Sequence, residues 1–210
     1  MNRRIAAAAG AALYLLLLAI PPRAEAQAVS SIRGDSRIAT KWVVDPVHSQ
    51  IDFRVRHLVG RVRGTFTRWY AVITTTERDW TRGVVNVSVQ TSSLSTGNAY
   101  RDADLRSSRF FAVDSYPSMS FQGTGLAASD TTVEVSGVLT IKGHSHPVTL
   151  TGQYRGIAED AEGHERIAFE ASTVLDRRDY GMDWNQTVAG TRMIGDEVEI
   201  TVALEAVRID

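Results

Sequence analysis

The most regular pattern in the chain is an alternation of apolar and polar residues over positions 133–154, VEVSGVLTIKGHSHPVTLTGQY. A period of two places alternate side chains on opposite faces of a β-strand. The alternation breaks at Lys142-Gly143-His144-Ser145, where the glycine supplies the backbone freedom that a tight reversal needs. Pro147 follows and presets the start of the returning strand. The segment therefore predicts an antiparallel hairpin with one apolar face.

Each apolar row of this hairpin is interrupted by a glycine, Gly137 in the first strand and Gly152 in the second. A glycine inside a strand lets the sheet bend, and it also leaves space where a side chain would stand. We therefore expect a bend, an internal cavity, or both at these two positions.

The same two-residue period recurs along the rest of the chain and defines further strands. One strand is expected from Gly64 to Ile73, where both faces carry aromatic residues and the inner face stays unassigned. The other apolar rows are Ile51, Phe53, Val55 and His57; Val85, Val87 and Val89; Met119, Phe121 and Gly123; Ile167, Phe169, Ala171 and Thr173; and Val198, Ile200, Val202, Leu204 and Ala206.

The two-residue period is lost between Thr96 and Ser108. Asn98 is a favourable N-cap, so we expect a short helix that turns Tyr100 and Leu105 inward. The chain thus contains about eight strands and lacks the crossover helices that a parallel sheet needs. Mid-strand glycines favour curvature, so the predicted fold class is all-β, an antiparallel β-barrel with one short helix. A barrel of about eight strands either fills its interior with side chains or holds one small ligand.

Residues 1–26 have the layout of a secretory signal peptide. Two arginines precede an apolar run over residues 5–20, which is shorter than the roughly 18–20 residues that span a bilayer. Cleavage after Ala26, at an A-x-A site, would leave an exported protein without a cysteine for lipid attachment. An uncleaved anchor is the alternative. Residues 27–40 are small and polar, so we expect a disordered lead-in before a single domain over residues 41–210.

Charge and cysteine content exclude several classes of function. The formal net charge is −1, and it becomes −3 without residues 1–26, a segment that carries three arginines and one glutamate. A chain without a basic excess is a poor partner for nucleic acid, so no nucleic-acid binding is expected. The chain has no cysteine, which excludes disulfides and thiol chemistry.

Four blocks of the sequence, in order, resemble the YceI-like family. The resemblance covers roughly residues 41–207, nearly all of the expected mature chain. The blocks are residues 45–53 with His57 and 64–66; residues 105–113 with Tyr116-Pro117 and Phe121; residues 137–143 with Pro147-Val148; and residues 178–182 with 195–198.

The resemblance implies an elongated, lipocalin-like antiparallel barrel in the periplasm that binds long isoprenoid chains, such as polyprenyl lipids or quinone-like molecules. It implies no catalytic activity. Two positions depart from the family pattern: Arg109 stands where an acidic residue usually precedes the double phenylalanine, and Leu175 or Tyr180 replaces a phenylalanine of the last block. Both departures would touch the rim or lining of a pocket. The identity of the ligand is therefore the property that the resemblance to the family implies least strongly for this chain.

Histidines would dominate any metal site in this cysteine-free chain. His144 and His146 lie two residues apart at the hairpin turn, but zinc takes three or four protein ligands and no carboxylate is near them in sequence. We therefore favour a solvated turn. His57 continues an apolar row, either as a hydrogen-bonded structural residue or as a contact for a ligand headgroup. The chain also lacks a G-x-S-x-G nucleophile motif, so no enzyme activity is expected.

Five arginines gather within two expected strands: Arg54, Arg56, Arg61, Arg63 and Arg68. A solvated outer face is the favoured explanation. The alternative is a pocket rim that meets a lipid phosphate or a quinone oxygen.

We predict a carrier that encloses an isoprenoid lipid or quinone-like chain, with no other cofactor. Transient membrane contact and pairing with a second copy at the barrel mouth stay open. Two alternatives are an interaction module with a solidly packed barrel and a metal-dependent enzyme using His48, His57 or the His144/His146 pair. The candidate ligand-binding residues are Phe53, Val55, His57, Phe66, Val85, Val87, Phe110, Phe111, Met119, Phe121, Leu139, Ile141, Leu150 and Phe169.

Overall fold

The computed structural model describes residues 39–76, 79–129 and 131–209. The predicted signal peptide and residues 27–38 of the predicted lead-in lie outside the described residues. No helix within the described part is long and apolar enough to cross a lipid bilayer.

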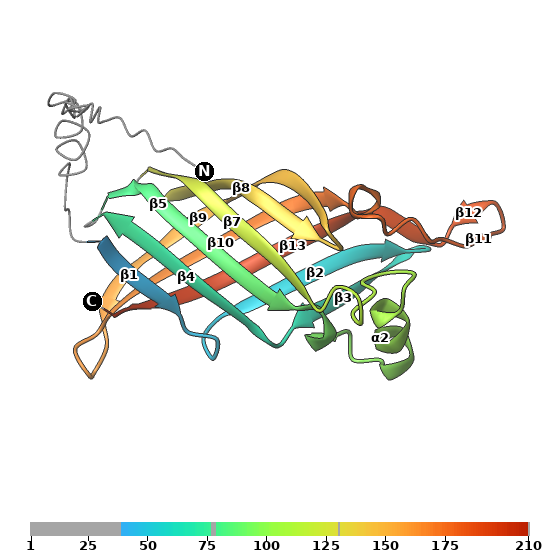
Figure 1. Cartoon of the computed structure of the whole chain (residues 1–210), viewed down its shortest axis with the longest axis horizontal. Helices are drawn as coiled ribbons and strands as arrows, with labels where there is room; N and C mark the ends of the chain where they lie inside the picture. The colour runs from blue at the N-terminus through green and yellow to red at the C-terminus, as the bar shows by residue number, and fades with distance from the viewer. Residues whose placement is uncertain (1–38, 77–78, 130, 210) are drawn as a thin grey trace, which may run out of the picture. The chain divides into compact units, whose positions relative to one another are not determined.

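Eight antiparallel strands close into a barrel, as the alternating rows predict (Figure 1). Each strand pairs with the next in the order β1-β4-β5-β7-β8-β9-β10-β13, and β13 pairs back to β1 through Val44 and Ala206. The strands are β1 (Ala39–Val44), β4 (Trp69–Thr76), β5 (Asp79–Gln90), β7 (Ser118–Ser129), β8 (Thr132–Ile141), β9 (His144–Glu159), β10 (Glu165–Asp176) and β13 (Ile194–Arg208).

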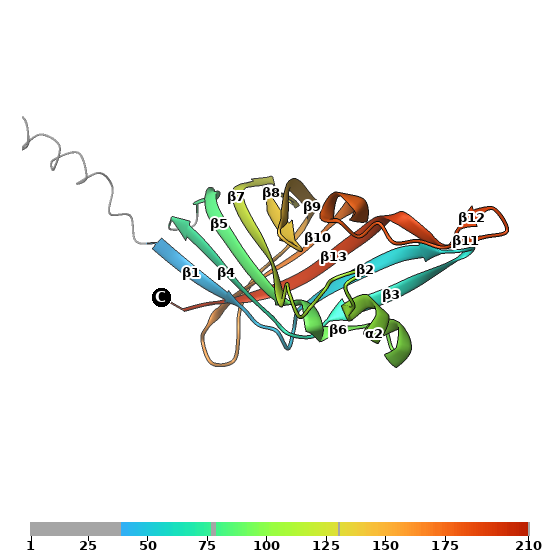
Figure 2. The same cartoon turned by 45° about the vertical axis from the view of Figure 1, so that its right-hand side comes forward.

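Three further strands extend the sheet from β13: β2 (Gln50–His57), β3 (Gly60–Phe66) and β6 (Leu94–Ser95). The last residues of β13 pair with β1 and the earlier ones with β2, so β1 and β2 lie in succession along one edge of β13. Between them the chain bulges over residues 45–49, where the Glu205 amide donates to Ser49 Oγ at 2.8 Å. Beyond the bulge β2 pairs with β3 instead of β4, so these strands leave the barrel wall (Figure 2).

The central hairpin forms as predicted, with β8 and β9 in register from Val133 opposite Gly152 to Ile141 opposite His144. Its turn is tighter than the predicted four residues and consists of Lys142 and Gly143 alone. Both have positive φ angles, 51° and 78°, which is the geometry of a type I′ hairpin turn.

The predicted strand from Gly64 to Ile73 is wrong, because the chain reverses at Thr67-Arg68 and forms β3 and β4. The buried residue before the turn, Phe66, has an even number, whereas those after it, Ala71 and Ile73, have odd numbers. This change explains why aromatic residues occur on both faces of the predicted strand. Thr67 bonds to the Ser93 carbonyl through its amide, at 3.2 Å, and its hydroxyl, at 3.0 Å. A distant segment thus stabilises a turn that has no glycine, proline or asparagine.

The glycines of the apolar rows lie where neighbouring backbones approach closely. A Cβ at Gly152 would overlap the Glu170 carbonyl of β10, and a Cβ at Gly137 would overlap the Gln122 carbonyl of β7. Only a residue without a side chain permits such an approach, so both glycines are needed for the packing of neighbouring strands, and the bend stays a prediction.

The lead-in ends earlier than predicted. Residues 39 and 40 belong to β1, where Thr40 is buried opposite Thr75 of β4. The first strand therefore begins two residues before the predicted domain boundary, because pairing with β4 supplies backbone partners that the small, polar sequence does not reveal.

The predicted helix is present as α2 (Ala99–Arg106), and Asn98 caps it by accepting the Arg101 amide at 3.0 Å. Leu105 packs against the core, as expected, but Tyr100 is 91% exposed. The side chain buried on this helix is instead Asp102, whose Oδ1 accepts the Thr96 amide at 2.9 Å. Two short 3-10 helices, η2 (Thr91–Ser93) and η3 (Arg177–Tyr180), and the small hairpin of β11 (Thr187–Val188) with β12 (Thr191–Arg192) complete the described elements.

Candidate functional site

The barrel encloses an inner chamber of about 140 Å³. Its wall combines the apolar rows of β4, β5, β7, β8, β9, β10 and β13, with Ser120 and Thr173 as the residues bearing polar side chains. Apolar cavities of about 150 Å³ stay dry and take up ligands as small as benzene. Trp42, Val133 and Ile167, all at most 2% exposed, belong to one buried cluster with Ala71, Ile73, Val85 and Phe169, which line the chamber.

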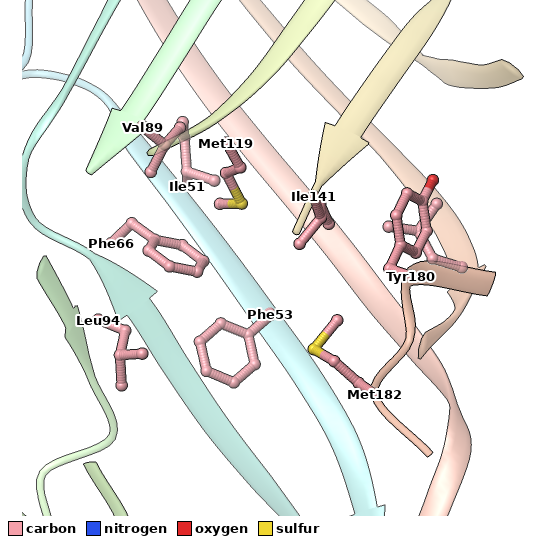
Figure 3. Packing of buried hydrophobic residues seen from close by; sticks show 10 residues of the cluster. Ile51, Phe53, Phe66, Val89, Leu94, Met119, Ile141, Tyr180 and Met182 are labelled. Carbon is pink, nitrogen blue, oxygen red and sulfur yellow. The ribbon is translucent and has the colours of Figure 1, made fainter. Parts of the chain in front are cut away.

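An outer chamber of about 500 Å³ lies where β2 and β3 leave the barrel. Its wall is formed by β2, β3, α2, the Phe110-Phe111 pair, η3 and residues 182–200. This volume falls within the roughly 300–1,000 Å³ of ordinary small-molecule sites. The aromatic side is ordered by ring contacts. The ring centroids of Phe53 and Phe66, which Figure 3 shows next to each other, are 5.6 Å apart. Those of Phe66 and Phe111 are 5.8 Å apart.

The two chambers adjoin each other through a shared ring of residues. Five side chains line both: Phe66, Met119, Ile141, Leu175 and Ile200. They come from β3, β7, β8, β10 and β13, so they surround the junction from most sides of the barrel. We call the two adjoining chambers, the smaller apolar one and the larger one, the tunnel; the barrel is therefore not packed solid, as the first alternative required.

All fourteen predicted ligand-binding residues line this tunnel. Val85, Val87, Phe121, Leu139, Leu150 and Phe169 line the inner chamber; Phe53, Val55, His57, Phe110 and Phe111 line the outer one; Phe66, Met119 and Ile141 line both. Their contact with a ligand stays a prediction.

Sequence reasoning missed much of the outer wall. Met182, Trp184, Met193 and Ile194 come from a stretch without strand alternation, so no period marked them as inward. The missed residues of the inner wall, such as Ile200, Val202 and Leu204, lie in an apolar row that the alternation did identify. For those residues the signal was present in the sequence.

Arg177 of η3 is buried beside the outer chamber and organises its rim. It donates from Nε to the Gly195 carbonyl at 2.9 Å, from Nη1 to the Met182 and Trp184 carbonyls, and from Nη2 to the Asp196 carboxylate at 3.0 Å. Burial lowers the pKa of Arg177. These bonds tie residues 182–196 to η3, so the irregular part of the wall has fixed partners.

The departure from the family pattern at Arg109 also touches the rim. The Arg109 guanidinium lies 4.7 Å from the ring centre of Trp184 and pairs with Asp104. Trp184 in turn meets Phe110 edge to face, with centroids 5.6 Å apart. Cation–π and edge-to-face contacts of this kind hold aromatic rings in place. Arg109 therefore supports the wall from outside.

A third hollow of about 190 Å³ interrupts the barrel wall between β9 and β10. The register of these strands ends at Thr151 opposite Ser172, and beyond that point Asp179 and Tyr180 of η3 line the hollow. A ring nitrogen of His146 lies 2.9 Å from the Asp179 carbonyl, and its ring meets Tyr180 edge to face. Burial, with the nearby Asp179 charge, raises the pKa of Tyr180 to about 12.

The histidines are spread over different parts of the structure. His57 lines the outer chamber, and His146 bonds to η3. Asp45, His48 and Glu205 could together offer three metal ligands, with their ligand atoms within 4.8 Å of one another. Arg166 Nη1 already donates to Asp45 Oδ2 at 3.0 Å and to Glu205 Oε1 at 2.6 Å, so the guanidinium neutralises these two carboxylates.

Comparison with known proteins agrees with this architecture. The model of the YceI-like domain matches residues 42–206. Protein YceI of Salmonella arizonae is 30% identical over 176 residues, which cover 82% of this chain and 90% of the relative. Protein YceI of Salmonella paratyphi B matches to the same extent.

Solved structures share the fold at lower identity. BcnA of Burkholderia cenocepacia superposes with a TM-score of 0.65 at 19% identity, covering 77% of this chain and 98% of that one. A polyisoprenoid-binding domain from Saccharophagus degradans, implicated in plant cell wall breakdown, gives 0.63 at 16% identity, covering 80% and 98%. A YceI protein of Campylobacter jejuni gives 0.62 at 24% identity, covering 71% and 86%. The chain belongs to the YceI-like domain family.

Proposed function

We propose that this protein is a periplasmic carrier that encloses the chain of an isoprenoid lipid or quinone-like molecule in its barrel. The observation that carries the proposal is the pair of adjoining chambers, apolar along the inner one and joined through a ring of five shared side chains. The YceI-like family, and the polyisoprenoid-binding description of a structural neighbour, support the same class of ligand.

The energetics favour a long apolar chain over a small polar metabolite. Burial contributes about 0.8 kcal/mol per methylene, so roughly a dozen buried methylenes give about 10 kcal/mol before the costs of association. Micromolar binding requires about 8 kcal/mol. A small metabolite would need polar contacts, whereas the inner chamber is lined by apolar side chains apart from Ser120 and Thr173.

Binding rather than catalysis is therefore the proposed activity. The two chambers also suggest how a ligand is oriented: the apolar tail in the inner chamber, the headgroup in the outer one near His57, Asn98 and Arg101. Export to the periplasm is part of the proposal and is supported by the layout of residues 1–26.

Two measurements test the proposal. The first is extraction of the purified protein with organic solvent, followed by mass spectrometry, which should recover an isoprenoid lipid or quinone. The second is titration of the lipid-free protein with farnesol, geranylgeraniol and a longer polyprenol, which should bind with increasing affinity. A straight-chain alcohol of matched carbon number is the control for non-specific uptake. Recovery of no lipid, together with no binding of any prenol, would overturn the proposal.

A further inference from the structure

Two hairpins end near one another beyond the barrel, and the turn of the first lies at the base of the second, which projects past it (Figures 1 and 2). One is the β2–β3 turn at Leu58-Val59, and the other joins β11 to β12 through Ala189-Gly190. The Leu58 amide donates to the Met193 carbonyl at 2.7 Å, and Arg56 Nη1 donates to the Leu58 carbonyl at 2.9 Å. We call these two turns with their flanking residues the hairpin tips.

The hairpin tips expose aliphatic side chains at a cost in backbone conformation. Val59 is fully exposed and Val188 is 43% exposed. Leu58 has a φ of 51°, a left-handed conformation that suits asparagine or glycine and strains other residues. A two-residue hairpin turn with a positive φ at its first residue and not at its second favours glycine at the first, so local stability does not account for Leu58. An observed strained residue is a sound starting point for a functional inference.

The outer face beside the tips carries a dense row of arginines. Arg54 lies opposite Arg63, and Arg56 lies opposite Arg61, across β2 and β3. Like charges directly opposite each other destabilise a sheet. Glu199 bonds to Arg54 at 2.5 Å and lies 3.9 Å from Arg61. Among the described residues, Glu199 is the carboxylate that forms ion pairs with arginines of this row. The row therefore has an excess of positive charge in a chain whose net charge is −1.

The tips adjoin the outer chamber. His57 and Val62 flank the first turn and line that chamber, as do Met193 and Ile194 beyond the second hairpin. A surface that rests on the tips would therefore lie next to the wider end of the tunnel.

We propose that the hairpin tips dock on a bilayer containing anionic phospholipids. Val59 and Val188 would enter the boundary between headgroups and acyl chains, and the arginine row would contact lipid phosphates. Exposed apolar residues flanked by basic ones bind such surfaces through both burial and charge attraction. The role in loading or unloading a lipid rests on the proposed carrier function, whereas the docking itself does not.

Co-sedimentation with vesicles tests the docking. Neutral vesicles of phosphatidylcholine are compared with anionic vesicles of phosphatidylcholine and phosphatidylglycerol. Wild type and all variants begin at the same residue, so that they differ only in the substitutions. Wild type should bind the anionic vesicles, and binding should fall with added salt. Each arginine lost should weaken binding about fivefold. Arg61→Ala/Arg63→Ala should therefore bind much more weakly than Lys41→Ala/Arg155→Ala, which removes two exposed charges elsewhere.

A second variant separates docking from folding. Leu58→Gly/Val59→Asn places favourable turn residues at the tip, so it should keep or raise the unfolding midpoint and lose vesicle binding. Val174→Asn, at an exposed valine of β10, is the matched control and should bind as wild type does. Farnesol titration should be unchanged in the tip variant. Equal vesicle binding by wild type, the Leu58/Val59 variant and the Arg61/Arg63 variant would overturn the docking proposal. Absent farnesol binding with intact vesicle binding would overturn only the carrier function.

Discussion

The ring of Phe53 on β2 lies over the bare Cα of Gly64, the residue opposite it on β3. A Cβ at Gly64 would overlap Phe53 Cζ and come within 2.9 Å of Thr96 Cγ2. Phe53 lines the outer chamber and lies beside Phe66 at its junction with the inner one. The missing side chain on β3 therefore sets the position of one wall of the tunnel.

Gly64→Val should push the Phe53 ring into the outer chamber. We expect weaker binding of a polyprenol, and a loss of stability of about 1–3 kcal/mol, which is typical of overpacking. Ligand titration and urea unfolding measure the two effects. Gly60→Val is the matched control on the same strand, because a Cβ there would meet its nearest neighbour, the His57 carbonyl, at 3.7 Å. Equal affinity of the two variants would show that Phe53 does not shape the site.

Ala171→Leu should fill part of the inner chamber, because Ala171 lies on the inward row of β10 and lines that chamber. A ligand that loses the space for about three methylenes loses about 2 kcal/mol, or roughly thirtyfold in affinity. The loss should be largest for long prenols and small for farnesol. Calorimetric titration with prenols of increasing length measures it.

The neighbouring substitution Ser172→Leu provides the control for Ala171→Leu. Ser172 is exposed on the opposite face of the same strand. The Ser172→Leu substitution adds the same apolar side chain outside the barrel, so the affinity for every prenol should stay at the wild-type value. An equal loss in both variants would mean that the inner chamber holds no part of the ligand.

The inner chamber could be predicted from sequence because its wall follows a local rule. Residues such as Leu139, Ile141 and Leu150 alternate with polar neighbours, and a closed antiparallel barrel turns every such row inward. The outer chamber follows no such rule. Its irregular wall at Met182 and Trp184 depends on Arg177, whose role requires partners up to 19 residues away in the chain.

The same distinction explains the strand that was wrongly predicted as continuous. The turn at Lys142-Gly143 contains a glycine, a residue type that indicates a turn in the sequence. The turn at Thr67-Arg68 contains no such residue and is instead stabilised by the bond from Thr67 to the Ser93 carbonyl. Sequence spacing cannot reveal a bond between residues 26 positions apart. Local propensity therefore identified the strands, and long-range contacts decided where two of them separate.

Arg177→Met should destabilise the protein and loosen the rim of the outer chamber. The change would leave three carbonyls, those of Met182, Trp184 and Gly195, without their donor. An unsatisfied buried polar group costs about 1–3 kcal/mol, so a loss of about 3 kcal/mol in the free energy of unfolding is expected. Urea unfolding measures it.

Arg178→Met is the control for Arg177→Met, since Arg178 is exposed on the same 3-10 helix and pairs with Asp176 at the surface. Exposed ion pairs contribute about 0–1 kcal/mol, so this variant should remain close to wild type. If the two variants are equally stable, the buried guanidinium does not hold the rim together.

Stability should fall on acidification through the ion pairs of Arg166. Arg166 bonds to Asp160 at 2.8 Å and to Asp45 at 3.0 Å. The bond to Arg166 is the main reason why the pKa of Asp160 is lowered to about 2, and the bond to His48 is the main reason why the pKa of Asp45 lies well below its usual range. The unfolded chain takes up these protons near pH 4, before the folded one does. The stabilisation is therefore present above about pH 4 and is lost as the pH falls towards about 2.

Urea unfolding at a series of pH values between about 5 and about 2 checks this expectation. Asp160→Asn and Arg166→Met should each give a shallower dependence of unfolding free energy on pH than wild type. Because both substitutions break the same interaction, the double variant should lose less than the sum of the two single losses. Strictly additive losses, or slopes as steep as in wild type, would mean that these carboxylates do not stabilise the fold through Arg166.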